Sequence, residues 1–363
     1  MDVCLVAGAR PDFVKVAPIV RAINKAKAGG DDISYKLVYM GAECDHTLEQ
    51  SLYCDLGMPA PDVFLGIECD NLNELAGLSM AKFDAYLSEN HTDLVLVVDD
   101  LASTMAVAIA TKKRGILLAH IVAGTRSFDM SMPKEINRLV IDGLSDFLFT
   151  ADSNSSSIAT REGAQLSHIY MVGNVLVDSL RYNCNRLEKP ALFGQLGMGE
   201  GDYIVFTVNR KAVLGDAKLL EGIAQTVQAA AGGVRVVAPL RGVAKQVLEE
   251  ILGKMPNFTI VPPLPYLEFG YLLSHSKGIV TDSGNIAEEA TFYGIPCATV
   301  NTYTEHKETV TRGTNVLVGE NLAQLKEAVA DMCGGRWKNS SLPEMWDGRT
   351  AERIVKILTQ IGH

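Results

Sequence analysis

Residues 278–290 join a short apolar run to a turn of small polar residues, Thr281-Asp282-Ser283-Gly284-Asn285. The run predicts a buried strand, and the residues after the turn predict a helix. Backbone N–H groups at the start of that helix, together with the Ser283 hydroxyl, can bind a diphosphate. Glu289, a turn into that helix, is placed to accept a pair of ribose hydroxyls. We therefore interpret this segment as a nucleotide site rather than as a capped helix with exposed acids.

A second candidate anion site follows the first apolar run, at Gly8-Ala9-Arg10-Pro11. Glycine permits close approach of the backbone, and Arg10 and Lys15 supply positive charge near a helix N-terminus. The alternative is a tight turn with a solvated cation. Spacing alone does not separate the two interpretations.

Two adjacent aspartates, Asp99 and Asp100, follow the apolar run Leu94–Val98 and precede an apolar helix at 101–110. An aspartate that opens a helix is most often its N-cap, which leaves the other one free for chemistry. His120 ends another buried run. A satisfied core histidine is the usual role of such a residue unless a carboxylate lies close to it.

These residues need a scaffold, and the chain shows short, continuously apolar runs alternating with segments of helical period. In open parallel sheets, ligands collect beyond the carboxyl ends of the strands, where the candidate residues lie. The alternation predicts two doubly wound, Rossmann-like α/β domains. The predicted strands are Val3–Ala7, Lys36–Met40, Leu94–Val98, Leu117–Val122, Phe147–Thr150, Ile169–Val172, Tyr203–Thr207, Val234–Ala238, Phe258–Val261, Gly278–Thr281 and Pro296–Val300.

The predicted helices set the domain boundaries. The first runs through Val16 and Ile23 to Gly29-Gly30, with a kink at Pro18, and others cover Leu219–Ala229 and Val243–Leu252. We place the N-terminal domain at residues 1–172 and the C-terminal, nucleotide-binding domain at 173–348. An amphipathic helix at 349–363 is expected to pack back on the first domain.

Composition excludes several classes of protein. The chain has 363 residues, 47% hydrophobic and 21% charged, which favours about two ordered domains. A formal net charge of −10 argues against nucleic acid or an anionic membrane as partner. Neither a secretion signal nor a membrane-length apolar stretch is visible. The seven cysteines are scattered without a C-x-x-C pair, which indicates reduced thiols in a cytoplasmic protein and no zinc site. We expect no metal and no cofactor.

Read together, these motifs resemble the UDP-N-acetylglucosamine 2-epimerase family of the nonhydrolysing type, and the likeness runs essentially from end to end. The segments that carry it are Arg10-Pro11 with Lys15, Asp100, Ala123-Gly124-Thr125-Arg126, Pro133-Lys134-Glu135-Ile136-Asn137-Arg138, Val172-Gly173-Asn174, Thr281-Asp282-Ser283-Gly284 with Glu288-Glu289, Arg312-Gly313-Thr314-Asn315, and Asp347-Gly348 with Arg353-Ile354.

The resemblance implies a glycosyltransferase-B-like fold with the ligand in the interdomain cleft, and a homodimer. It implies that Ser283, Gly284 and Glu289 hold UDP. Asp100 and Arg138 would face the sugar, and the residues expected near the phosphates are Arg10, Lys15 and Arg210. Asn209 is expected among the substrate-binding residues. The family reaction removes the C2 proton and UDP to leave a glycal, then adds both back with inverted C2, in the synthesis of cell-surface polysaccharide precursors.

The chain departs from the family pattern at groups that this chemistry uses. Val122 replaces the glutamate of the family's H-x-E-A-G stretch, Lys134 the first glutamate of P-E-E-x-N-R, and Asn209 the histidine of H-R-R-E-N. His306 replaces the arginine of E-R-P-E. The Q-H-R stretch of the effector site reads Glu43-Cys44-Asp45, which argues against allosteric activation by UDP-N-acetylglucosamine.

Three interpretations follow. The first is an epimerase with a rearranged acid/base set, in which proton transfer is carried by Asp100, Glu135, Lys134 or His120. The second is a glycosyltransferase or hydrolase that uses the same nucleotide site. The third is a binding protein without catalysis. We favour the first, because a mere nucleotide binder need not keep Asp100 beside the sugar.

Overall fold

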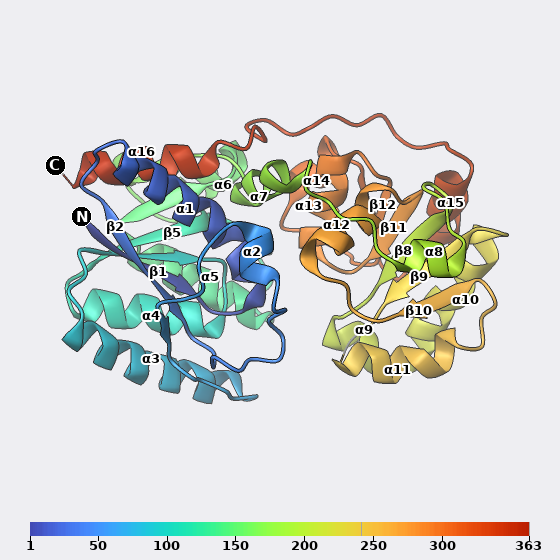
Figure 1. Ribbon diagram of the computed structural model, residues 1–363, viewed down its shortest axis with the longest axis horizontal. Helices are drawn as coiled ribbons and strands as arrows, with labels where there is room; N and C mark the ends of the chain where they lie inside the picture. Colours follow the sequence, from blue (N-terminus) through green and yellow to red (C-terminus); the bar gives the residue numbers. More distant parts are fainter. Residues whose placement is uncertain (241, 363) are drawn as a thin grey trace. The chain divides into compact units, whose positions relative to one another are not determined.

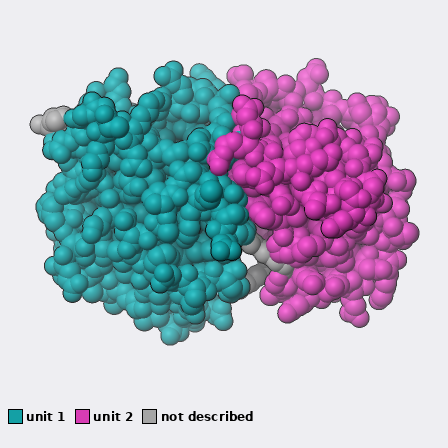
Figure 2. Space-filling view, in the orientation of Figure 1, with its two compact units in different colours: residues 1–183, 344–363 teal, residues 184–343 magenta. Residues whose placement is uncertain are grey.

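The structure is a computed structural model that describes residues 1–240 and 242–362, apart from the side chains of Lys211 and Ala212. It divides into two compact units, the first made of residues 1–183 and 344–363 and the second of residues 184–343 (Figure 2). The division lies one helix later than the sequence suggests. Helix α7 (Val175–Asn183) belongs to the first unit, where the Ser179 hydroxyl donates a hydrogen bond to the Val14 carbonyl at 2.6 Å.

The first unit is built around a parallel sheet in the order β3-β2-β1-β4-β5-β6-β7 (Figure 1). Its strands are β1 (Asp2–Ala7), β2 (Ser34–Tyr39), β3 (Val63–Phe64), β4 (Leu94–Val98), β5 (Leu117–Ala123), β6 (Phe147–Thr150) and β7 (Ile169–Met171). Its other helices are α1 (Arg10–Ala28), α2 (Leu52–Leu56), α3 (Leu72–Glu89), α4 (Ala102–Lys113), α5 (Pro133–Leu144), α6 (Ser153–Arg161) and α16 (Thr350–Ile361), with a 3-10 turn at Leu166–His168. Helix α1 runs through Pro18 and ends at Gly29.

Helices cover both faces of this sheet because successive strand side chains point to opposite sides. Cys4 and Val6 of β1 pack in one buried cluster with Phe83 of α3 and Val107 of α4. The intervening Leu5 is equally buried, on the side covered by α1. Burial on both faces explains why the predicted strands read as continuous apolar runs.

The second unit repeats the plan with a parallel sheet in the order β10-β9-β8-β11-β12-β13. Its strands are β8 (Tyr203–Thr207), β9 (Arg235–Pro239), β10 (Phe258–Val261), β11 (Gly278–Thr281), β12 (Cys297–Thr299) and β13 (Asn315–Leu317). Its helices are α8 (Leu192–Leu196), α9 (Lys211–Gly215), α10 (Ala217–Ala231), α11 (Gly242–Leu252), α12 (Tyr266–Ser274), α13 (Gly284–Tyr293), α14 (Lys307–Thr311) and α15 (Leu322–Cys333).

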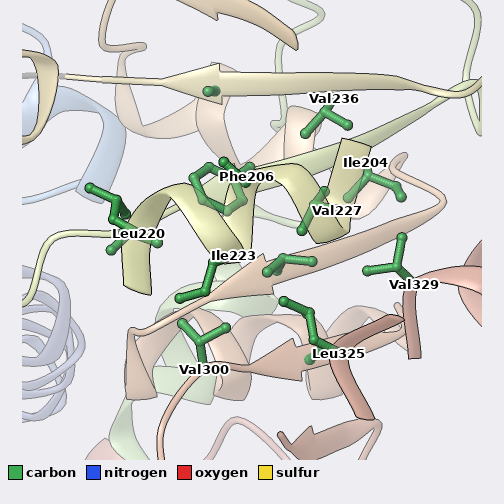
Figure 3. Packing of buried hydrophobic residues seen from close by; sticks show 14 of the residues in the cluster. Ile204, Phe206, Leu220, Ile223, Val227, Val236, Val300, Leu325 and Val329 are labelled. Carbon is green, nitrogen blue, oxygen red and sulfur yellow. The ribbon is translucent and has the colours of Figure 1, made fainter. Parts of the chain in front are cut away.

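Alternate residues of β8 serve the two faces of this second sheet. Phe206 packs against Ile223 of α10 and Leu325 of α15 in the cluster drawn in Figure 3. Its neighbour Val205 belongs to the opposite cluster, which includes Leu272 of α12. The prediction of two doubly wound α/β domains is therefore confirmed. The edge strands β3 and β13 lie outside the predicted runs, because two or three residues are too few to show a strand period.

The C-terminal helix α16 packs on α1 and α7 of the first unit, as the amphipathic pattern predicts. Asp178 of α7 holds its N-terminus, with carboxylate oxygens that accept from the backbone N–H groups of Thr350 at 3.2 Å and Ala351 at 2.8 Å. Burial raises the pKa of Asp178 to about 6. Within the described residues, every helix is too short or too polar to cross a lipid bilayer.

Replacing Asp178 by Ala should lower the free energy of unfolding of the first unit by about 1–2 kcal/mol, because α16 loses the acceptor for two terminal N–H groups. The parent protein should also lose stability as pH rises from 3.8 toward about 6, since the folded state holds the Asp178 proton more tightly than the unfolded state does. Urea unfolding across that pH range tests both. Lys25→Ala is the control: Lys25 is 77% exposed and only pairs with Glu352 of α16 at the surface, so its loss should cost under about 1 kcal/mol.

Candidate functional site

The charged residues predicted in the first unit gather where β1, β4 and β5 end. These strands are neighbours in the sheet. After β1 the chain adds β2 and β3 on one side of β1, and it then crosses to the other side to add β4 and the later strands. Such a switch point leaves a crevice at the carboxyl ends of the strands, which is where open α/β sheets bind ligands. The fold therefore brings the turns after three separate strands to one place.

Arg10 and Lys15 both have carboxylate partners. The guanidinium of Arg10 makes two hydrogen bonds to Glu49, at 2.8 and 2.5 Å, and the Lys15 ammonium lies 2.6 Å from an Asp99 oxygen. The two side chains are 17% and 5% exposed, so neither is a solvated cation. An anion that approached them would compete with Glu49 and Asp99.

The backbone N–H groups of the predicted Gly8-Ala9 anion turn already have an acceptor. The Asp12 carboxylate accepts from the N–H of Gly8 at 2.7 Å and of Ala9 at 3.2 Å. Burial, reinforced by the charge of Asp99, raises the pKa of Asp12 to about 7. The side chain that follows the turn thus occupies the place that an anion would take on these N–H groups.

Asp100 is bracketed by two cations. Its carboxylate oxygens lie 2.8 Å from the Lys134 ammonium and 2.6 Å from the Arg138 guanidinium, both on α5. Burial alone would raise the pKa of Asp100, but the charges of Lys134 and Arg138 hold it below its usual value. Neither Asp99 nor Asp100 caps α4, whose N-cap is Leu101, so the prediction that one of them does is wrong.

Glu135 points into the protein rather than toward solvent. Its carboxylate accepts from the N–H of Ser127 at 2.9 Å and of Phe128 at 2.8 Å, and it pairs with Arg138 at 3.0 Å. Burial alone would raise the pKa of Glu135, but these hydrogen bonds lower it. The side chain fixes the loop before α5 and has little accessible surface.

His120 lies in a buried network with Asp142, which the sequence analysis did not single out. Its Nδ1 is 2.6 Å from an Asp142 oxygen, and its Nε2 is 3.0 Å from the Asp99 carbonyl oxygen. Both ring nitrogens therefore have an oxygen partner inside the protein. Arg126 also pairs with Asp142, at 2.7 Å. His120 therefore supports the Asp99 turn instead of facing a ligand.

Val122 has an unusual backbone for its side chain. Its φ is 71°, in the left-handed region that β-branched residues avoid, and the pairing of β5 with β6 shifts register between Ile121 and Ala123. The Gly124 N–H, just beyond it, donates to Asp142 at 3.0 Å. This hydrogen bond helps to hold the strained turn, and such strain is typical of functional sites.

In the second unit, Asp282 joins the turns after β8 and β11, the two neighbouring strands at this sheet's switch point. One of its oxygens accepts from the backbone N–H of Asn209 at 2.8 Å and of Arg210 at 2.7 Å. Asn209 itself is exposed. The Arg210 side chain lies over the Tyr303 ring, 5.5 Å from its centroid. Asp282 thereby positions both predicted residues.

Helix α13 begins at the predicted nucleotide turn. Ser283 is its N-cap, with a long contact of 3.4 Å from the Ile286 N–H. Among the described residues, no protein atom accepts the backbone N–H groups of Gly284 and Asn285. Glu289 lies one turn further on and is partly exposed. The N–H groups at the start of α13 can therefore bind an anion. The corresponding N–H groups before α1 in the first unit already donate to Asp12.

Two groups of side chains have the composition of metal ligands within the described residues. One, Asp2 with His91 and Asp93, is fully exposed. The other, Glu288 with His306 and Glu308, is partly buried beside α13. Its histidine was noted in the sequence only as a replacement for arginine, and spacing gave no sign that Glu288 contacts it.

The neighbouring residues Lys134, which is 54% exposed, and Glu135, which is buried, should differ in their contribution to stability. Glu135→Ala should lower the free energy of unfolding by about 2–3 kcal/mol, because two loop N–H groups and Arg138 lose their acceptor. This cost should shrink as pH falls below about 4.5, where the stabilisation by ionised Glu135 is lost. Lys134→Ala, which removes a 54% exposed partner of Asp100, should cost under about 1 kcal/mol in the same urea titration. Equal costs for the two variants would contradict this assignment.

Comparison with known proteins agrees with this arrangement. Residues 25–359 match the family model described as UDP-N-acetylglucosamine 2-epimerase. The chain is 30% identical to UDP-N-acetylglucosamine 2-epimerase of Methanocaldococcus jannaschii, over 99% of each chain. It is 32% identical to UDP-2,3-diacetamido-2,3-dideoxy-D-glucuronate 2-epimerase of Pseudomonas aeruginosa, over 99% of this chain and 100% of the other.

Solved structures extend the likeness to the fold. The crystal structure of the Methanocaldococcus jannaschii enzyme with UDP-N-acetylglucosamine and UDP has a TM-score of 0.87 and covers 99% of this chain and 100% of that one. The Neisseria meningitidis enzyme reaches the same TM-score of 0.87 at 24% identity, over 99% of this chain and 100% of that one, and so shows the fold alone. With its two Rossmann-like units and a match over nearly its whole length, the chain belongs to the UDP-N-acetylglucosamine 2-epimerase family.

Proposed function

We propose that the protein interconverts the C2 epimers of a UDP-N-acetylhexosamine. The reaction removes the C2 proton and breaks the bond from C1 to the phosphate oxygen, so that UDP leaves with that electron pair and a glycal remains. UDP and a proton then add back, the proton from the opposite face. The observation that carries the proposal is the pair of N–H groups at Gly284 and Asn285, which lack a protein acceptor among the described residues and open α13 in a chain of this family.

The second unit would hold the nucleotide. Ser283, Gly284 and Asn285 offer backbone N–H groups and a hydroxyl to the diphosphate, and Glu289 is placed one turn further to accept the ribose hydroxyls. Arg210, positioned by Asp282, adds positive charge. In the first unit, Arg10 and Lys15 are the further cations that a phosphate could engage, in exchange for their partners Glu49 and Asp99.

Among the four candidate acid/base residues, Asp100 and Lys134 are the pair that a sugar could reach. Glu135 and His120 are about 1% exposed and already have partners for their polar atoms. Lys134 is 54% exposed and lies against Asp100. We therefore assign proton transfer at C2 to this pair, with Arg138 holding Asp100 in place.

Catalysis would take place in the cytoplasm, in a homodimer that supplies precursors of surface polysaccharide.

Incubation with UDP-N-acetylglucosamine in deuterated water should place deuterium at C2, as seen by NMR. Turnover should be slow, because one positioned acid or base contributes about 10²- to 10⁴-fold and Val122, Lys134 and Asn209 replace three such groups or phosphate contacts. Asp100→Asn should abolish the exchange, while Glu352→Gln, at the exposed surface, should leave it unchanged. Binding of UDP without any exchange at C2 would favour a non-catalytic binding protein, and UDP release without C2 exchange would favour a transferase or hydrolase.

A second candidate substrate is a UDP-sugar with an extra anionic group on the ring. Lys134 places a half-exposed cation where the family pattern has a glutamate, and a carboxylate on the sugar would complement that charge. The Pseudomonas aeruginosa relative is named for a substrate that is a glucuronate. Charge complementarity and this relationship support an anionic sugar as the alternative.

Comparing kcat/KM for UDP-N-acetylglucosamine and for UDP-2,3-diacetamido-2,3-dideoxy-D-glucuronate distinguishes the two substrates. If the sugar is anionic, the parent protein should prefer the glucuronate, and Lys134→Gln should reduce that preference by roughly 10-fold, the value of one charge-assisted contact. Lys113→Gln, a change at another exposed lysine of the first unit, is the matched control. A preference that is unchanged in Lys134→Gln would contradict a role for this lysine in choosing the sugar.

A further inference from the structure

Asp99 and Asp100 are paired with helices on opposite faces of the first sheet. The Asp99 carboxylate lies 2.6 and 2.7 Å from the ammonium of Lys15, which belongs to α1. The Asp100 carboxylate lies instead against Lys134 of α5, at 2.8 Å. Helix α1 covers one face of the sheet and α3 and α4 cover the other (Figure 1), where Ile141 of α5 joins their buried cluster. Two consecutive aspartates therefore direct their carboxylates to two sides of the same crevice.

The backbone fixes the position of the Asp99 carboxylate. Asp99 has a φ of 58°, in the left-handed region that aspartate and asparagine adopt more readily than most residues. Its carbonyl oxygen lies 3.0 Å from Nε2 of the buried His120. The contact with His120 thus holds the backbone of this turn, and the Asp99 carboxylate takes no part in it.

The pairing of β4 with β5 brings Asp99 level with Val122. Val98 is aligned with Ile121 in these two parallel strands. The residues that follow, Asp99 and Val122, both have left-handed backbones, with φ of 58° and 71°. Val122 offers only hydrocarbon, so Asp99 supplies a carboxylate where the turn after β5 supplies none. The Asp99 side chain is 18% exposed, more than the 12% of Asp100.

Inversion at C2 calls for a proton-transfer group on each face of the sugar ring. The proton leaves from one face, and the proton of the product enters from the other. The proposed function gives one of these faces to Asp100. A carboxyl group can serve in both directions of a reaction, because its ionised form takes up a proton and its protonated form returns one. A second accessible carboxyl group, on the other side of the crevice, is what the opposite face needs.

We propose that Asp99 is the second acid/base residue of the reaction and acts on the C2 face opposite to the one that Asp100 meets. This inference rests on the proposed function and adds a catalytic residue to it. Lys15 holds the Asp99 carboxylate at 2.6 Å, and a phosphate of the ligand that engages Lys15 would leave this carboxylate open to the sugar.

The protons and electron pairs balance in both directions. Asp100 takes the C2 proton of UDP-N-acetylglucosamine, the C–H electron pair forms the C1=C2 double bond, and UDP leaves C1 with the electron pair of the broken C–O bond. UDP then bonds to C1 again, and the double-bond electrons take a proton from protonated Asp99 at C2. In the reverse direction, ionised Asp99 takes the C2 proton of UDP-N-acetylmannosamine, and protonated Asp100 returns one on the other face.

A purely structural ion pair is the competing interpretation of the contact between Asp99 and Lys15. A buried lysine needs a counter-charge, and Lys15 is only 5% exposed. In that role Asp99 would support the site as a whole, and its removal would slow the reactions of both epimers alike. A group that acts on one face of the ring affects the two epimers unequally.

Deuterium exchange at C2, followed by NMR from each epimer separately in deuterated water, tests the inference. The parent should place deuterium at C2 of both epimers. Asp99→Asn keeps an acceptor for Lys15 and a residue that tolerates the left-handed backbone. This variant should still exchange UDP-N-acetylglucosamine with retained configuration, because Asp100 removes and returns that proton. Inversion, and exchange from UDP-N-acetylmannosamine, should fall by roughly 10²- to 10⁴-fold.

Two further variants show that the effect belongs to this carboxylate. Asp100→Asn should give the mirror image, with exchange from UDP-N-acetylmannosamine alone. Asp146→Asn is the matched control, since Asp146 also pairs with a lysine, Lys112, at 2.7 Å, but precedes β6 at the other end of the sheet. It should leave exchange from both epimers unchanged.

Full retention of both exchanges in Asp99→Asn would overturn the inference. So would an equal loss of both in Asp99→Asn and in Asp99→Gly, whose glycine adopts the left-handed backbone freely. In either case, exchange by the parent would leave the proposed function standing. A parent that exchanges neither epimer would overturn the proposed function, and this inference with it.

Discussion

Buried carboxylates that bind backbone N–H groups shape the ligand-facing edge of both sheets. The carboxylates of Asp12, Asp142 and Asp282 each accept a hydrogen bond from a backbone N–H group in a turn that follows a strand. These hydrogen bonds fix the turns. A buried carboxylate is costly unless hydrogen bonds or positive charges surround it, so each of them also dictates which donors point inward. In the first unit, the N–H groups of Gly8 and Ala9 donate to Asp12, and His120 lies against Asp142, so these groups already have protein partners. In the second unit, Asp282 holds the turn after β8 and leaves the start of α13 open.

The scaffold could be predicted well because its signals are local. The runs at β4, β8 and β11 are continuously apolar and end in polar turns, so the fold class and the α13 turn follow from patterns of a few residues. The contacts that decide whether a polar side chain is available to a ligand join residues far apart in the sequence. His120 meets Asp142 across 22 positions of the chain, and Lys15 meets Asp99 across 84. No spacing rule indicates such pairs, which depend on how helices cover the sheet.

The departures from the family pattern therefore differ in their effect on the structure. Val122 has a left-handed backbone, and its side chain cannot move a proton. Lys134 changes the charge beside Asp100 and remains accessible. His306 stands where the pattern has arginine, and Glu288 and Glu308 raise its pKa well above the usual value. Among the described residues, the second unit thus has N–H groups without a protein acceptor at the start of α13, and in the first unit the change of charge lies at Lys134.

The first unit is discontinuous in sequence, and this has a consequence for biosynthesis. Its core needs α16, which caps on Asp178 and packs against α1, yet the whole of residues 184–343 is made before that helix. At about 5–20 residues per second, the nascent N-terminal part waits on the order of ten seconds or more with the α16-facing surface of α1 uncovered. The second unit is continuous and can complete its fold first on the ribosome. Chaperone protection during this interval would matter more for the first unit than for the second.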